Sequence, residues 1–509
     1  MISDFDITLA LRDDMIAKGI DIALTQSILA DIRAGMCDAR PGVDVAGVPL
    51  VDGVSIVPSG IDMRYKISQH AAQERLAALG LSLPSGLSVD GDMVVFDRAT
   101  LVDIGERLYP VTAWGVLNGG SATSYADRKK NSALGSDVFM AIKEGFELLA
   151  PLCEGRPKGV TPAYLNPDGS PGESFILLKM RAALLRAARY VQRFGKPPRS
   201  LLPFFQMTSD VTDAPLAQAY AEYAKHPWLA SLIATTGSDP TKPLSAKQPL
   251  LAAFTHSDTG NPRRVFDRAY GKSDSAIALP GGHGQGFRVL ADVYRTLLSQ
   301  GYRYAYLGNV DNVGYYPDAA EIAVMALSGA EAAFDFSYRT PVDIKGGILV
   351  DTMDGRRTVA DIGQAISFER VLALESEGSR VLFNCATGIF DLACLVPRLD
   401  EIAKRLPLRV SDQDKDAGRY SQAEQTTWEV IGLLKNPLGF AVEKGDRFIA
   451  AKLLTETLLA SSLGEEALAS LPSEVAATTA MMAKGLRGVL SDVCGLKVVD
   501  GIWTPRENP

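Results

Sequence analysis

The sequence has 509 residues, of which 47% are hydrophobic, and its formal net charge is -8. This length exceeds what one hydrophobic core usually holds, so about two or three domains are expected. The negative charge, with no basic run beyond Arg128 to Lys130, argues against nucleic acid or an anionic membrane as the main partner. No window reaches the roughly eighteen apolar residues of a membrane span, and the N-terminus carries acidic residues where a secretion signal would be apolar.

The cysteines indicate the redox compartment. There are five of them, an odd number, and none has the C-x-x-C spacing of a zinc or redox site. Such cysteines are typical of reduced, mostly buried thiols, so we expect a cytoplasmic protein.

Taken in chain order, the apolar pattern first predicts amphipathic helix over 7–32, within an N-terminal accessory domain at 1–108. From Thr112 short apolar strands alternate with helices, which predicts an α/β core with a mixed, mostly parallel sheet at 109–400. The predicted strands are 112–117, 201–207, 250–255 and 302–308, and the predicted helices are 136–150, 174–193, 214–224 and 285–299. The C-terminal domain, 401–509, reads as largely helical, at 422–435, 450–462 and 474–490, with a strand near 439–443.

A glycine loop follows the first core strand. The run from Val111 to Lys130 ends an apolar strand in Asn-Gly-Gly, then small hydroxyl residues and three basic side chains. Gly119 and Gly120 allow the backbone to approach a ligand closely, and the N–H groups that follow can point at phosphate oxygens. The pattern therefore suits a nucleoside triphosphate, although it is neither standard phosphate-binding fingerprint and an ordinary tight turn is the alternative.

Polar residues end other predicted strands, at the sheet edge where ligands of open α/β folds bind. Asp311 lies between Asn309 and Asn312 directly after an apolar strand. A single carboxylate there can coordinate Mg²⁺, whose remaining ligands are typically phosphate and water. The alternative is a turn in which these side chains bond their own backbone.

Two further features could meet phosphate. His283 lies among four glycines in the loop 279–287, before a predicted helix, and a surface histidine is the alternative interpretation. Lys345 and Lys452 are flexible point charges suited to phosphate, or solvated surface cations. No G-x-S-x-G motif or cysteine–histidine pattern indicates a nucleophile, so covalent catalysis is not expected.

Together and in order, these segments resemble the UTP:sugar-1-phosphate uridylyltransferases, the UDP-glucose pyrophosphorylase family, over about 110–455. The matching segments are LNGGSATSY (117–125), PFFQMTSDVTD (203–213), LPGGHGQGF (279–287), GNVDNVG (308–314), RTPVDIKGG (339–347) and DRFIAAK (446–452). The resemblance implies a nucleotide-diphospho-sugar transferase core of the GT-A, Rossmann-like type, with UTP held by the glycine loop.

The resemblance also implies site residues, which fall into three groups. Catalytic residues are Lys130, Asp311 and Lys452, with Asp311 the Mg²⁺ ligand; nucleotide-binding residues are Leu117, Asn118, Gly119, Gly120, Thr123, Met207, His256 and Gly282; sugar-phosphate residues are His283, Asn309, Asn312, Asp343, Lys345, Asp361 and Asn384.

The chain departs from the family pattern at several of these positions. Lys130 aligns with the family's loop lysine only after a one-residue gap, and His256 stands where a glutamine would read uracil. Asp361 is a shorter acid than the family's glutamate, and Ala386 replaces an amide near the sugar. The tail beyond 455 reads as helices in place of the family's β-helix, so its assembly mode is not carried over.

We therefore expect a Mg²⁺-dependent enzyme that makes a UDP-sugar and pyrophosphate from UTP and a sugar 1-phosphate. One alternative keeps the fold but consumes a nucleotide sugar as a glycosyltransferase. The other is a homologue that binds nucleotide without turnover. The sequence leaves open the preferred base, the sugar, the direction of flux and the oligomeric state.

Overall fold

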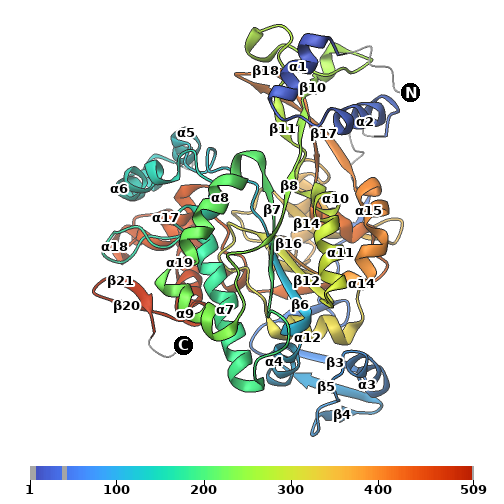
Figure 1. Cartoon of the computed structure of the whole chain (residues 1–509), viewed down its shortest axis with the longest axis vertical. Helices are drawn as coiled ribbons and strands as arrows, with labels where there is room; N and C mark the ends of the chain where they lie inside the picture. The colour runs from blue at the N-terminus through green and yellow to red at the C-terminus, as the bar shows by residue number, and fades with distance from the viewer. Residues whose placement is uncertain (1–6, 37–42, 134, 507–509) are drawn as a thin grey trace.

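A twisted mixed sheet runs through the centre of the computed structural model, which describes residues 7–36, 43–133 and 135–506 (Figure 1). Along its main path the order is β2-β19-β13-β16-β12-β6-β7-β8, and β16 alone runs antiparallel to both of its neighbours on that path. The strands of the sheet are β1 (Val45–Gly47), β2 (Ile56–Ser59), β6 (Thr112–Leu117), β7 (Phe204–Ser209), β8 (Leu244–Gln248), β12 (Tyr304–Asn309), β13 (Ala332–Tyr338), β14 (Gly347–Thr352), β15 (Arg357–Asp361), β16 (Leu382–Asp391) and β19 (Pro437–Val442). The predicted mixed, mostly parallel α/β core is confirmed.

Helices cover both faces of this sheet (Figure 1). Their bounds are α1 (Leu9–Ala17), α2 (Ile22–Arg33), α3 (Gln69–Ala77), α4 (Arg98–Arg107), α5 (Arg128–Ser132), α6 (Ser136–Cys153), α7 (Phe175–Phe194), α8 (Asp210–Tyr223), α9 (Pro227–Thr236), α10 (Gly286–Val289), α11 (Ala291–Ser299), α12 (Ala319–Ser328), α13 (Phe368–Ser376), α14 (Leu392–Leu395), α15 (Leu399–Arg405), α16 (Lys444–Arg447), α17 (Leu454–Ser462), α18 (Glu465–Ala469) and α19 (Ser473–Gly488). Among the described helices, none combines the length and the apolar character needed to cross a membrane.

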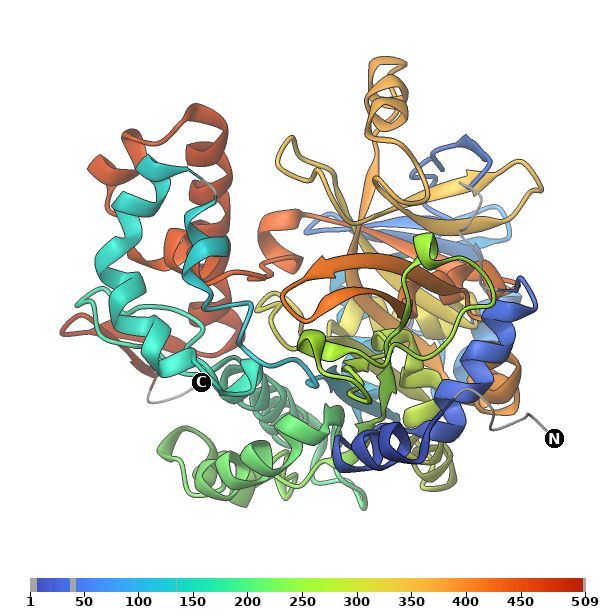
Figure 2. The same cartoon turned by 90° about the horizontal axis from the view of Figure 1, so that it is seen from above.

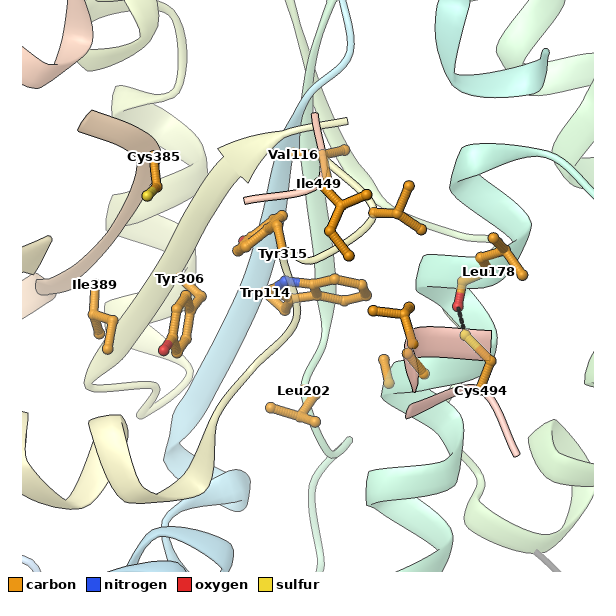
Figure 3. Packing of buried hydrophobic residues seen from close by; sticks show 14 of the residues in the cluster. Trp114, Val116, Leu178, Leu202, Tyr306, Tyr315, Cys385, Ile389, Ile449 and Cys494 are labelled. Carbon is orange, nitrogen blue, oxygen red and sulfur yellow. Dashed lines mark hydrogen bonds between the residues drawn. The ribbon is translucent and has the colours of Figure 1, made fainter. Parts of the chain in front are cut away.

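The alternation of side chains along β6 explains why both faces are buried. Trp114 and Val116 point to one face and pack in the cluster that contains Leu178 of α7, as Figure 3 shows. Ala113 and Leu117 point to the opposite face, toward α10 and α11. Because successive residues of a strand face opposite sides, an almost wholly apolar strand is the sequence signature of a sheet covered twice.

Smaller sheets extend the core. They are β3 (Arg64–Ser68), β4 (Ser88–Asp90) and β5 (Met93–Asp97); β9 (Leu250–Ala252) with β11 (Ala278–Pro280); β10 (Phe254–Thr255) with the hairpin β17 (Leu408–Lys415) and β18 (Gly418–Gln425); and β20 (Leu496–Val499) with β21 (Ile502–Pro505). Helices α1 and α2 pack on β9 and β10 through an apolar cluster that contains Leu24, Ile28, Leu251 and Phe254. The N-terminal helices therefore lie over the β17–β18 end of the molecule (Figure 1).

Two predicted elements differ from the structure. The strand expected at 250–255 is split between β9 and β10, which pair with β11 and β18 outside the central sheet, while β8 forms the sheet edge. The helix expected at 422–435 is the end of β18 followed by the 3₁₀ segment η7 (Thr427–Leu433). An apolar run does not identify its pairing partner, and tertiary pairing decided both cases.

The helical part of the C-terminal region packs against an insertion in the core. Figure 2 shows α5 and α6 beside α17 and α19, away from the central sheet. Asn131 after the glycine loop accepts the backbone N–H of Thr455 at 2.8 Å, and the hydroxyls of Tyr125 and Thr457 lie 2.6 Å apart. The helices predicted at 450–462 and 474–490 are confirmed as α17 and α19. The domain boundaries at 108 and 400 remain a prediction, and the central sheet itself includes β2 and β19 from outside them.

Candidate functional site

The glycine loop begins at a rigid, buried turn at the carboxyl end of β6. Leu117 pairs in register with Met207 of β7, and both side chains are buried. Asn118 is fully buried, and its amide donates to Gln206 Oε1 and to the Tyr220 hydroxyl, each at 3.1 Å. Because the side chain of Asn118 is held from two sides, the backbone leaves the sheet at a fixed point.

Of the two glycines after this turn, Gly120 is exposed and Gly119 is half-buried. The Gly119 carbonyl accepts the Ser209 hydroxyl at 2.8 Å. A Cβ added at Gly120 would meet nothing within 4 Å, so the surface above Gly120 is clear. The Gly120 carbonyl accepts the backbone N–H of Lys158 at 3.0 Å, which brings a second segment against the loop.

Lys158 was not predicted as a site residue, yet it lies at the centre of the site. Its Nζ is 2.6 Å from Asp311 Oδ2, and both side chains are largely buried, at 11% and 15% exposure. The ammonium also lies 4.9 Å from the centre of the Tyr125 ring. The other carboxylate oxygen of Asp311 is buried and has no hydrogen-bond partner among the described residues.

Lys130, the lysine predicted from sequence, occupies a different place. It lies on the short helix α5, is exposed, and donates from Nζ to the Ser124 hydroxyl at 2.7 Å. Thr123 is also exposed, with its hydroxyl 3.2 Å from that of Ser121. The structure therefore brings Lys158, rather than Lys130, against Asp311. The catalytic role of Lys130 remains a prediction.

The turn after β12 holds Asp311 and brings Lys452 alongside. Asn309 ends β12 opposite Leu117. The backbone N–H of Ala451 donates to the Asp311 carbonyl at 3.2 Å, so exposed Lys452 follows directly. Asn312 is fully buried and both ends of its amide are used, which places it as a support of the turn. Its donor bonds the Arg447 carbonyl at 2.9 Å, and its acceptor binds the Ile449 N–H at 2.9 Å.

Two buried basic side chains, Arg447 and Lys179, stabilise this turn from the protein interior. Arg447 donates to Glu321 at 2.9 Å and to Asp335 at 3.0 Å. The pKa of Asp335 is raised well above its usual range, mainly by burial and secondly by the negative charge of Glu321. Lys179 donates to the Asn312 carbonyl at 2.6 Å, and burial lowers its pKa to about 7 against the opposing charge of Asp311. The Asp311 turn is thus fixed in the protein.

Gly282 lies beside the glycine loop, joined to it by Gln248. The φ of Gly282 is +80°, and an added Cβ would fall 2.4 Å from the Gln425 carbonyl oxygen, so only glycine fits. Gln248 ends β8; it donates to the Gly282 carbonyl at 2.7 Å, and its Oε1 is 3.6 Å from the Cβ position of Gly119. Gln248 was not predicted, because the strand β8 that it ends was not predicted either.

The charged neighbours of His256 are two aspartates, Asp258 and Asp412. It follows β10, outside the central sheet, with Nδ1 2.7 Å from Asp258 Oδ1 and Nε2 3.8 Å from Asp412 Oδ2. Its predicted role in reading the base is untested, and Gln248 is the amide side chain that lies next to Gly119 and Gly282.

His283 begins the turn before α10 and is held by Thr427. Its Nδ1 accepts the Thr427 backbone N–H at 3.0 Å, so the neutral ring carries its proton on Nε2. Burial, then the charge of Lys452, lowers the pKa of His283 to about 4, with Asp311 acting in the opposite direction. His283 is therefore a neutral hydrogen-bond donor at neutral pH, within electrostatic range of Lys452 and Asp311.

A pocket of about 330 Å³ opens between the core and the C-terminal helices, and Lys345 and Lys452 both line it. Asp343 lines it as well, but its carboxylate is paired with buried Lys444 and accepts the Thr340 backbone N–H at 2.8 Å. Asp343 therefore shapes the loop that carries exposed Lys345.

Asp361 and Asn384 lie together at the end of the β14–β15 hairpin. Asp361 Oδ1 lies 3.2 Å, and the Asn384 Cβ 3.7 Å, from the Cβ position of Gly347. Asn384 accepts the backbone N–H of Ala386 at 3.0 Å, and Ala386 has a φ of +52°. The two residues that the resemblance places at the sugar are thus neighbours in space.

Comparison with known proteins shows which proteins this chain is similar to. Residues 262–469 match the family model of UTP–glucose-1-phosphate uridylyltransferase. This part of the chain is therefore similar to the UTP–glucose-1-phosphate uridylyltransferases. The chain is 27% identical over 282 residues to a probable UTP–glucose-1-phosphate uridylyltransferase of Schizosaccharomyces pombe, a match that covers 54% of this chain and 52% of the relative. It is 26% identical over 185 residues to the Hordeum vulgare uridylyltransferase, covering 36% and 38%.

Solved structures of a UDP-glucose phosphorylase and a UDP-glucose pyrophosphorylase share the fold over most of the chain. The UDP-glucose phosphorylase of Trypanosoma brucei matches 98% of this chain and 81% of its own with a TM-score of 0.55 at 17% identity. A Leishmania major UDP-glucose pyrophosphorylase variant in complex with UDP-glucose matches 98% of this chain and 83% of its own with a TM-score of 0.52 at 16% identity. The sequence matches, in contrast, span about half or less of the relatives' own length.

Proposed function

We propose that the chain transfers a uridylyl group from UTP to a sugar 1-phosphate, releasing pyrophosphate and giving a UDP-sugar. The observation that carries this proposal is the contact of 2.6 Å between Lys158 Nζ and Asp311 Oδ2, directly beside the Gly120 carbonyl. It joins a glycine loop, a lysine and a carboxylate from separate segments at the carboxyl ends of β6 and β12, where open α/β sheets bind ligands.

The reaction needs alignment and positive charge more than it needs a protein nucleophile. The attacking oxygen belongs to the sugar phosphate and is already anionic. The protein must therefore hold two polyanions together and stabilise the charge that develops on the α-phosphate and on the departing pyrophosphate. Lys158 beside the glycine loop and Lys452 beside the Asp311 turn are placed to supply that charge. His283 would donate its Nε2 proton to a phosphate or sugar oxygen.

Asp311 fits a magnesium ion. Its Oδ1 is a buried oxygen with no hydrogen-bond partner among the described residues, and Mg²⁺ commonly takes one or two protein carboxylates with phosphate and water. No group of three or more metal-binding side chains occurs in residues 7–36, 43–133 and 135–506, so phosphate oxygens would complete the coordination. When bound, the ion would offset phosphate charge.

Gln248 and Gly282 support uridine as the base. The Gln248 amide nitrogen donates to the Gly282 carbonyl at 2.7 Å and to Gln285 Oε1 at 3.0 Å, and its Oε1 lies 3.6 Å from the Cβ position of Gly119. The resemblance implies a glutamine that reads uracil at the position of His256, and we infer that Gln248 takes this role here. Because both N–H groups of this amide are donated within the protein, its Oε1 is the atom that can accept the N3–H of uracil. The described cysteines, Cys153, Cys385, Cys394 and Cys494, are free thiols, which supports a cytoplasmic location.

A pyrophosphate-release screen tests the proposal. The full chain is incubated with Mg²⁺, each of four nucleoside triphosphates and a panel of sugar 1-phosphates. We expect pyrophosphate with UTP and at least one hexose 1-phosphate, and loss of this signal with EDTA. Tight nucleotide binding without product in any mixture would instead identify a non-catalytic homologue, and sugar transfer from a UDP-sugar without pyrophosphate chemistry would identify a glycosyltransferase.

A further inference from the structure

Arg409, on strand β17, joins carboxylates from two other parts of the chain. Its Nη1 donates to Asp361 Oδ2 at 2.7 Å and to Gln364 Oε1 at 2.8 Å, at the end of the β14–β15 hairpin. Its Nη2 donates to Glu429 in η7. The Arg409 side chain is 11% exposed and that of Glu429 is 3% exposed, so the ion pairs are shielded from solvent.

Both carboxylates face groups of the proposed site. Asp361 flanks Gly347 together with Asn384. Glu429 follows two residues after Thr427, which holds His283, and the charge of Glu429 acts on His283. Arg409 thus connects the end of the β14–β15 hairpin, which carries Asp361, with the segment that holds His283.

We propose that Arg409 is a positioning residue that fixes Asp361 and Glu429 and thereby sets the affinity of the site for the sugar part of its substrate. This inference rests on the proposed function. A guanidinium is planar and presents its donors in a rigid fork, so one arginine restrains two carboxylates in a single geometry. Ordering Asp361 before the ligand arrives removes part of the entropy cost of binding.

The charges of this group also favour one class of sugar. Asp361 is the more exposed carboxylate of this group, with 26% of its side chain exposed against 3% for Glu429. A neutral sugar can donate a hydroxyl hydrogen bond to the Asp361 carboxylate, whereas a sugar acid would bring a like charge. The site should therefore prefer a neutral, hydroxyl-bearing sugar.

The experiment compares UDP-glucose with UDP, which lacks the sugar, by calorimetry on the full chain. Arg409→Met should weaken the binding of UDP-glucose about tenfold or more and change the binding of UDP less than about twofold. The reason is that the variant loses the hydrogen bonds of Arg409 to Asp361 and Glu429, which we place beside the sugar and not beside the nucleotide. Arg409→Lys, which keeps the charge but not the fork, should fall between the wild type and Arg409→Met. UDP-glucuronic acid should bind the wild type at least about tenfold more weakly than UDP-glucose.

A double-variant cycle separates positioning from general stability. If Arg409 acts through Asp361, then Arg409→Met should add little to the loss already caused by Asp361→Asn. The matched control is Arg303→Met, which removes an arginine bound to Asp391 through two bonds of 2.7 Å at the far end of β12. This control should lower the Tm without changing the ratio of UDP-glucose to UDP affinity.

Several outcomes would overturn the inference. Equal weakening of UDP and UDP-glucose in Arg409→Met, or fully additive losses in the double variant, would reduce Arg409 to a structural residue. Equal binding of UDP-glucuronic acid and UDP-glucose would remove the charge argument. A wild-type protein that binds neither UDP nor UDP-glucose would refute the proposed function, and the role of Arg409 with it.

Discussion

Replacing Lys158 by methionine tests the centre of the site. At 2.6 Å, with an effective dielectric constant of about 20, the attraction between its ammonium and Asp311 is about 6 kcal/mol before the cost of desolvating both groups. The part that matters for turnover is the positive charge offered to the phosphates. Loss of one such preorganised contact commonly costs about a hundredfold to a thousandfold in kcat, or about 3–4 kcal/mol.

The assay is steady-state pyrophosphate release at saturating UTP and sugar 1-phosphate. Lys130→Met is the matched comparison, because Lys130 is an exposed lysine on the insertion that precedes Lys158 in the chain, and its Nζ donates to the Ser124 hydroxyl. An exposed contact of this kind is worth at most about 1 kcal/mol, so Lys130→Met should change kcat less than about fivefold. Lys158→Met also leaves Asp311 unpaired, so the free energy of unfolding should fall as well.

The double variant Lys158→Met with Asp311→Asn separates these two effects. It removes the unpaired buried charge and should recover part of the lost stability, but it should not recover activity. The reasoning fails if Lys158→Met turns over at the wild-type rate while Lys130→Met is inactive. It also fails if the double variant regains activity along with stability, because Lys158 would then act only on folding.

Three further predictions follow from the same geometry. Gln248→Leu should raise the KM for UTP about tenfold and reduce discrimination against CTP in steady-state kinetics, because the amide beside Gly282 is lost; an unchanged KM would return the base-reading role to His256. Gly282→Ala should lower the free energy of unfolding, measured in urea, by at least about 1–2 kcal/mol. The φ of Gly282 is +80°, and the Gln425 carbonyl oxygen would lie 2.4 Å from the new Cβ. A variant as stable as the wild type would contradict this prediction. The pKa of His283 is about 4 in the folded chain against an ordinary 6.5, so the unfolded chain binds more protons between these values and stability should fall as the pH drops from 6.5 to 4. The loss for this group is up to about 3 kcal/mol, and His283→Gln should flatten that part of the urea-derived curve; an identical curve would refute the assignment.

The core could be predicted because its signals are local. The buried strand β6 and the amphipathic helices α6 and α7 each carry their periodicity within one segment, and all three are found where the pattern placed them. The edge of the sheet could not be predicted in this way. The β8 segment, LSAKQ, is less apolar than 250–255, but its backbone pairs with β7, and a pairing between distant segments leaves no trace in either one alone.

The same limit explains which site residues were found. Asp311 and the glycine loop follow strands β12 and β6, which are parallel neighbours with Asn309 opposite Leu117, so strand-end reasoning brings them together. The sequence predicts His256 as the base-reading residue because the letters Phe-Thr-His-Ser at 254–257 resemble the family motif. Gln248 lies beside Gly119 because β8, and not the later apolar run, ends at that edge of the sheet.

Lys158 could not be predicted as a site residue because an insertion separates it from the glycine loop in the sequence. Residues 126–153, which contain α5 and α6, lie in the sequence between the glycine loop and Lys158, so the nearest lysine along the chain was Lys130. The backbone closes this gap in space, because Ala122 N–H donates to the Arg156 carbonyl at 2.9 Å and Lys158 N–H donates to the Gly120 carbonyl at 3.0 Å. The inserted helix α6 in turn packs on α17, the helix that follows Lys452. The insertion therefore connects the glycine loop, Lys158 and the Lys452 segment. A substitution in its interface with α17 should change the positions of Lys158 and Lys452, which we propose bind phosphate, although neither lysine is itself replaced.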